Sequence, residues 1–395
     1  MLGASASRSL PSPSAHAGAW VQPWSQRLAE LLWVGAATPL LFPLSWWLRG
    51  TWGLDPSELA VGALFFYAAH VVNDPHFAVT YVLFYRDVRA RAFGSAFGPA
   101  QRARYVLAGL VAPLLLLGWA AGALLARSAF ALALLFQLMF LLVGWHYVKQ
   151  GFGVLSVLAQ RRGVRFLPRE RSALLAHCYA GWAYAWASPV DLGTRTEQKG
   201  LVYTTLAHPP GLERATQLVF FATVLPLVWV LVQKRRREGP LPLFIPLLAF
   251  LSSIWLWTVY SSSDPLVRYA IPALHSLQYL YLVWLLHSNE ARERERDPWF
   301  EATVGVRVAW LALTAVGLGW LLFHAAPGAL DELLVPRRRA AMPLGPTPYL
   351  AAIFAFVNLH HYFMDAVLWR HENPLTRYLR VTHDAAPASE RVSGP

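Results

Sequence analysis

The chain has 395 residues, of which 56% are hydrophobic and only 14% are charged. With 18 tryptophans and a mean hydropathy of +0.38 it is too apolar for an ordinary soluble domain, which indicates a protein that crosses a membrane several times. The net charge of +12 would favour nucleic acid in a soluble protein. Here the arginines stand between apolar runs, so we expect no nucleic-acid partner. The single cysteine, Cys178, excludes an intrachain disulfide and any cysteine-based metal site.

Apolar runs organise the chain into one domain. Residues 1–26 are rich in Ser, Ala, Pro and Gly, so they are predicted to be a disordered tail rather than a signal peptide. A second disordered tail is expected at 371–395. The residues between them, 27–370, contain runs of the length that a bilayer core requires, which predicts an all-α bundle of about ten transmembrane helices. The expected spans are 29–48, 58–84, 105–126, 128–150, 172–190, 212–233, 241–261, 266–287, 303–325 and 347–369.

Basic residues follow every even-numbered span up to the eighth. They lie at 86–104, 161–171, 234–237 and 292–296. Because cytoplasmic loops carry the excess of lysine and arginine, we expect both termini in the cytoplasm and the chain in the cell (inner) membrane. The arginines at 337–339, before the tenth span, run against this pattern.

Four of the even-numbered spans contain histidines with polar neighbours. In the second span His70, Asn73 and Asp74 stand at i, i+3 and i+4 and would share one helix face, with Pro75 and His76 next to them. The other stretches are 145–150, 275–279 and 358–365. Ionisable groups in a membrane usually face a bundle interior and serve a function there. Each stretch precedes its basic loop by about 10–17 residues, so we expect the imidazoles to meet in the inner half of the membrane.

These residue types favour a metal centre. A histidine that binds a metal usually donates its second ring N–H to a polar neighbour, and each of these stretches supplies one. A donor set of imidazoles and carboxylates suits one or two transition-metal ions, with iron preferred. The expected ligands are His70, Asp74, His76, His146, His275, His360, His361 and Asp365. Catalytic roles in positioning the substrate or donating a proton are expected for Lys149, Gln150, Gln278 and Tyr279.

Other roles remain open for these histidines. A membrane histidine is often bonded to a neighbouring helix and is purely structural. Histidines near helix ends or in loops are expected to be solvated at the membrane interface. They are His177, His208, His287, His324, His371 and His383.

The pair His360-His361 resembles the end of a histidine box of membrane desaturases and hydroxylases, although His70 and His76 do not have the spacing of those boxes. The similarity is one of chemistry. The first hypothesis is a metal-dependent membrane oxidoreductase, of the oxygenase or desaturase type, that acts on a lipid-soluble substrate among membrane lipids and takes electrons from a donor protein. The alternative is a proton- or ion-coupled transporter that uses the same residues as a relay. A metal-free transferase with a histidine base, and haem held by two facing histidines, also stay open.

Overall fold

The computed structural model describes residues 24–95, 97–188, 193–295, 303–335 and 343–380. Most of them are helical, which confirms the expected all-α class. The longer α-helices are α2 (Leu41–Trp52), α3 (Leu54–Ala69), α4 (Asn73–Tyr85), α7 (Ala112–Leu125), α8 (Ala129–Arg161), α9 (Pro168–Ala187), α10 (Leu212–Ala222), α11 (Val224–Glu238), α13 (Val267–Glu295), α14 (Val304–Trp320) and α16 (Pro348–Leu368).

Shorter elements link or extend these helices. The short α-helices are α1 (Trp24–Trp33), α5 (Val88–Phe93), α6 (Pro99–Val106), α12 (Phe244–Leu251) and α15 (Ala326–Leu334). Segments of π-helix are η3 (Leu107–Val111), η4 (Ser252–Val259) and η5 (Leu321–Ala325), and segments of 3-10 helix are η2 (Thr38–Leu40) and η6 (Pro374–Leu379). Segment η5 contains His324.

One hairpin interrupts the helices. Strands β1 (Arg195–Gln198) and β2 (Leu201–Thr204) are antiparallel, with Gln198 opposite Leu201. The two-residue turn is Lys199-Gly200, and both residues have positive φ, as the tight turns that suit hairpin twist require. The Lys199 carbonyl accepts a 2.8 Å hydrogen bond from the hydroxyl of Thr347, so the hairpin is fastened to the residue that precedes α16.

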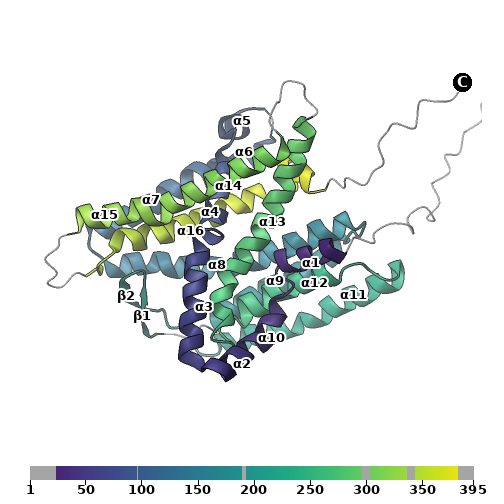
Figure 1. Ribbon diagram of the computed structural model, residues 1–395, viewed down its shortest axis with the longest axis horizontal. Coiled ribbons are helices and arrows are strands. Elements are labelled where there is room, and N and C mark those ends of the chain that lie inside the picture. Colours follow the sequence, from purple (N-terminus) through teal and green to yellow (C-terminus); the bar gives the residue numbers. More distant parts are fainter. Residues whose placement is uncertain (1–23, 96, 189–192, 296–302, 336–342, 381–395) are drawn as a thin grey trace, which may run out of the picture.

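Helix α13 passes between two groups of helices (Figure 1). On one side α4 packs against α14 and α16, and α16 also packs against α7 and α8. On the other side α8 packs against α9, α12 and η4. Helix α13 contacts α4 and α14 in the first group and α8 and η4 in the second. Four of these helices, α4, α8, α13 and α16, therefore meet in the interior, where most residues of α16 are buried.

Within the described residues, five helical segments are long and apolar enough to cross a membrane. They are Pro99–Leu125, Ala129–Arg161, Leu212–Glu238, Val304–Leu334 and Pro348–Leu368. The pair Trp24–Trp33 and Thr38–Trp52, bent by 77°, makes a sixth if it counts as one span. This is fewer than the ten spans expected.

The expected span 58–84 shows why the structure has fewer long apolar helices than expected. The chain leaves the helix after Ala69 and starts α4 at Asn73, so this run is two shorter helices rather than one. Pro75 lies in the first turn of α4, where its missing N–H costs no helical hydrogen bond. The expected tails fall mostly outside the described residues, which include 24–26 in α1 and 371–380 around η6.

Asp264 fixes the start of α13. Its Oδ1 accepts hydrogen bonds from the backbone N–H groups of Leu266 and Val267 at 2.9 and 3.0 Å and from the Ser45 hydroxyl at 2.7 Å. Arg49 donates to its Oδ2 at 3.1 Å. Burial alone would raise the pKa of Asp264, but these donors outweigh it and hold the pKa below its ordinary value. The carboxylate thus caps α13 and ties it to α2.

Candidate metal centre

Four imidazoles and one carboxylate converge in the interior, and we call these five residues the central cluster. They are His76 of α4, His146 of α8, His275 of α13, and His361 and Asp365 of α16. None of the five is more than 6% exposed. The residues come from four helices that are far apart in the sequence, so helix packing alone brings them together. One histidine from each of the four stretches therefore lies in the central cluster, and from the first stretch it is His76 and not His70.

The Nε2 atom of His146 lies at the middle of the central cluster. It is 3.1 Å from Nε2 of His275 and 3.3 Å from Nε2 of His361. The Oδ2 atom of Asp365 is 3.7 Å from it and 3.2 Å from His361 Nε2. One imidazole nitrogen offers either one hydrogen or one lone pair, so it cannot satisfy three such neighbours. A cation between these atoms satisfies all of them at once.

The spacing also fits metal ligands. Nitrogen ligands about 2.0–2.1 Å from a tetrahedral metal lie about 3.3 Å from one another, close to both nitrogen–nitrogen distances above. One ligand atom from each of His76, His146 and His275 lies within 4.8 Å of the other two, and the same is true of His146, His361 and Asp365. The two triads share His146, so the central cluster has donors for one or two ions.

Hydrogen bonds orient His76 toward the shared point. Its Nδ1 lies 3.2 Å from the hydroxyl of Ser276, which in turn donates to Asn73 Oδ1 at 3.0 Å or to the Pro272 carbonyl at 2.8 Å. The hydroxyl therefore accepts from His76, which places the ring hydrogen on Nδ1 and leaves a lone pair on Nε2. That Nε2 is buried and has no hydrogen-bond partner in the described part of the chain. A free, oriented lone pair is what a metal ligand requires.

Asp365 is oriented in the same way. Its Oδ1 accepts hydrogen bonds from the Tyr279 hydroxyl at 2.8 Å and from the Trp369 indole at 3.2 Å. Its Oδ2 is the atom that faces the histidines. The Tyr279 hydroxyl also lies 2.6 Å from the Thr80 hydroxyl. Among the residues that the structure describes, Nδ1 of His275 and Nδ1 of His361 have no partner, so no hydrogen bond sets the tautomer of those two rings.

The expected catalytic residues divide into three groups. Tyr279 touches the central cluster through Asp365. Gln150 donates to the His275 carbonyl and to Gln278 Oε1, both at 2.9 Å, and Gln278 donates to the Val34 carbonyl at 2.8 Å. These two amides brace α8, α13 and the loop after α1. Lys149 lies over the rings of Phe152 and Tyr179, at 5.7 and 5.8 Å, rather than beside the histidines.

His360 faces away from the central cluster, contrary to expectation. Its Nδ1 lies 3.0 Å from the Tyr81 hydroxyl and its Nε2 lies 3.0 Å from the Ala108 carbonyl, in the π-helical segment η3. Consecutive residues of a helix point about 100° apart, so His360 and His361 cannot face the same point. His360 therefore joins α16 to α4 and η3.

A second group lies on the opposite side of the start of α4, and we call it the peripheral cluster. Its members are His70, Asp74 and His324, whose ligand atoms lie within 4.8 Å of one another. His324 Nε2 is 2.8 Å from Asp74 Oδ2, and the rings of His70 and His324 stack at 4.3 Å. The chain turn at 70–72 explains why His70, Asn73 and Asp74 do not share one face: Asn73 bonds to α13 while Asp74 bonds to η5.

His324 was expected to be solvated at the membrane interface, but it belongs to the peripheral cluster. The position of this residue inside the expected span 303–325 was the available signal. Gly319 allows the approach, because a Cβ atom there would lie 2.7 Å from the backbone carbon of Asp74. Small residues let membrane helices pack closely in this way.

No family model, curated protein or solved structure matches the chain.

Proposed function

We propose that the chain is a membrane-embedded, metal-dependent oxidoreductase whose central cluster holds a transition-metal ion, with iron preferred. The observation that carries this proposal is the convergence of two imidazoles, of His275 and His361, and the Asp365 carboxylate on His146 Nε2, with a ligand atom of His76 within 4.8 Å of those of His146 and His275. Imidazole and carboxylate donors without thiolate suit iron and its neighbours in the first transition row. Bound there, such a metal supplies oxidation chemistry with dioxygen.

The reaction class that we propose is oxidation of a C–H bond in a lipid-soluble substrate. As a hydroxylation, the substrate R–H, dioxygen, two electrons and two protons give R–OH and water. The electrons come from a donor protein. The hydrogen-bonded chain Thr80–Tyr279–Asp365 ends at the central cluster and is buried along its whole length, so it holds the carboxylate in place beside the histidines. Buried apolar residues around Tyr279, among them Leu83, Val283 and Met364, limit the entry of water.

We place this centre in the cell (inner) membrane with both termini in the cytoplasm, on the support of the basic segments after the even-numbered expected spans. Five expected spans are not among the long apolar helices: 29–48, which corresponds to the bent pair, and 58–84, 172–190, 241–261 and 266–287. We propose that the last four also lie within the membrane, because two of them carry ligands of the central cluster.

Metal analysis of the detergent-purified chain, combined with an absorption spectrum, tests the proposal. We expect at least one transition-metal ion per chain, no haem band, and loss of the ion in His361→Ala. A chain that retains no transition metal through purification would overturn the proposal.

The peripheral cluster supports a second ion. It offers two imidazoles and a carboxylate, and its Asp74 stands two residues before His76 on the same helix. It also favours the second candidate function, a proton- or ion-coupled transporter. His324 is about one-third exposed while the central cluster is buried, so titratable groups run inward along α4 as a relay requires. Proton flux into liposomes in the absence of bound metal would favour the transporter.

A further inference from the structure

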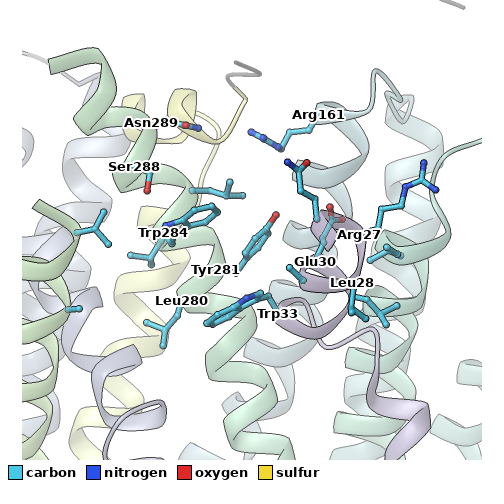
Figure 2. Close-up of a pocket in the computed structure, with 18 of the residues that line it drawn as sticks. Arg27, Leu28, Glu30, Trp33, Arg161, Leu280, Tyr281, Trp284, Ser288 and Asn289 are labelled. Carbon is cyan, nitrogen blue, oxygen red and sulfur yellow. The ribbon is translucent and has the colours of Figure 1, made fainter. Parts of the chain in front are cut away.

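A cavity of about 1110 Å³ lies between α1, α12, α13 and α14, beside the start of α4 (Figure 2). It exceeds the range of roughly 300–1,000 Å³ in which most small-molecule sites fall. The residues of the central and peripheral clusters do not line it. The cavity is therefore a separate site within the described residues.

One end of the cavity is basic. The lining contains four arginines, at positions 27, 161, 162 and 292, and one acidic residue, Glu30. Arg162 forms an ion pair with Glu30, and the lining as a whole carries an excess of three positive charges. Figure 2 shows Arg161, Ser288 and Asn289 together at this end of the cavity. Guanidinium groups next to such polar donors bind carboxylate and phosphate groups.

The other end of the cavity is apolar and aromatic. Trp33 and Leu280 lie there, with Trp284 on the wall between the two ends (Figure 2). Trp33 and Trp284 are 44% and 48% exposed, so their rings offer apolar surface to a ligand in the cavity. Exposed aromatic groups beside a basic patch match a molecule with an anionic head and an apolar tail.

The apolar end reaches the helix that carries a ligand of each cluster. Pro75 and Val79 of α4 line the cavity at i and i+4. His76 and Thr80, also at i and i+4, occupy the next face of the helix, toward the central cluster. The apolar tail of a ligand that lies against Pro75 and Val79 would therefore contact the face of α4 next to the face that carries His76.

We propose that this cavity binds an anionic amphiphile, with a carboxylate or phosphate head at the arginines and a long apolar tail along Trp284 and Trp33 toward α4. This binding does not depend on the proposed function of the central cluster. The same chemistry occurs in single-chain fatty acids and in membrane phospholipids, and competition separates the two.

Equilibrium binding of radiolabelled oleate to the detergent-purified full-length chain tests the proposal. We expect saturable binding that unlabelled oleate displaces and that methyl oleate and phosphatidylcholine do not. The double variant Arg27→Gln/Arg161→Gln should weaken binding about 25-fold, or about fivefold for each arginine. Ala312→Trp, at an exposed alanine of the lining, should fill the space for the apolar tail of oleate and abolish binding.

Two control variants make the same kinds of substitution at residues outside the cavity. Arg89→Gln, in α5, and Ala121→Trp, in α7, change exposed residues outside the lining and should bind oleate as the unmodified chain does. Equal displacement by methyl oleate, or equal binding by the cavity variants and the controls, would overturn the proposal. Binding of phosphatidylglycerol without oleate would support the anionic head and assign the occupant to membrane phospholipids rather than to fatty acids. Metal content measured on the same samples keeps the two proposals apart, because the cavity variants should retain their metal.

Discussion

The Nε2 atoms of His146 and His275 lie 3.1 Å apart in the buried centre of the bundle. Two neutral imidazoles can be this close only if one donates a hydrogen to the other, or if both lone pairs bind one cation. His361 Nε2 lies 3.3 Å from the same atom of His146 and 3.2 Å from Asp365 Oδ2. Hydrogen bonds would satisfy these atoms in separate pairs, whereas one shared cation would bind them together. The packing of α8 against α13 therefore places two nitrogen atoms where one metal ion could bind both.

His361 and its neighbour His360 provide a direct test of the central cluster. His361→Ala removes a ligand and should lower metal affinity by more than about 100-fold, beyond the 10–100-fold typical of losing an outer hydrogen-bond partner. His360→Ala removes a buried imidazole of the same helix that faces Tyr81 and Ala108, so it should keep its metal. Metal content by mass spectrometry is the measurement. Equal loss in both variants would mean that the effect comes from unfolding.

Tyr279 should tune the metal without binding it. Tyr279→Phe removes the hydrogen bond to Asp365 Oδ1, so the carboxylate loses orientation and metal affinity should fall about 10–100-fold. Tyr81→Phe makes the same change at a tyrosine bonded to His360 and should leave affinity within about twofold. Competition with a chelator measures both. An unchanged affinity in Tyr279→Phe would show that the hydrogen bond from Tyr279 does not tune the metal.

The approach of α14 to α4 should control the peripheral cluster. Gly319→Ala places a Cβ atom against the backbone of Asp74, so we expect a loss of about 1–3 kcal/mol in stability and displacement of His324 from Asp74. Gly317→Ala, two residues earlier, meets no described atom within 4 Å and should be neutral or gain up to about 1 kcal/mol in helix propensity.

Thermal unfolding measures the stability of the glycine variants, and metal analysis measures how many ions they bind. If the peripheral cluster holds its own ion, Gly319→Ala and His324→Ala should each lose one ion and keep the ion of the central cluster. Loss of all metal in His324→Ala would show that the two clusters are not independent.

Asp264 should make stability depend on pH in the acid range. Its folded-state pKa lies below the ordinary value of about 4, so its contribution is complete above that value and is lost as the pH falls through the lower, folded-state pKa. Asp264→Ala should cost about 0.5–2 kcal/mol at pH 7. The difference in Tm between the variant and the unmodified chain should shrink below about pH 4. Asp55→Ala, at an exposed aspartate of α3, is the control, and a difference that persists at low pH would contradict the capping role.

The positions of the basic segments predict the topology. Reporters fused after Arg91 or Arg162 should be cytoplasmic, and a reporter fused at Thr196 in β1 should be on the outside. Protease protection and reporter activity measure these positions. The opposite pattern at any two sites would exclude cytoplasmic termini.

The sequence by itself determined the all-α class and several of the apolar spans, because helix formation and membrane length depend on neighbouring residues. It also pointed to every residue of the central cluster, since an ionisable residue in an apolar run is conspicuous without any structure: His76, His146, His275, His361 and Asp365 were all expected ligands.

Tertiary structure decided which expected ligands meet. His360 and His361 are adjacent in the sequence, and only the orientation of α16 in the bundle directs one of them to His146 and the other to Ala108. The turn at 70–72 separates His70 from His76, and the close approach at Gly319 brings His324 to Asp74. Sequence spacing fixes which residues share a face within one helix, whereas contacts between helices depend on how those faces pack, which no local pattern encodes.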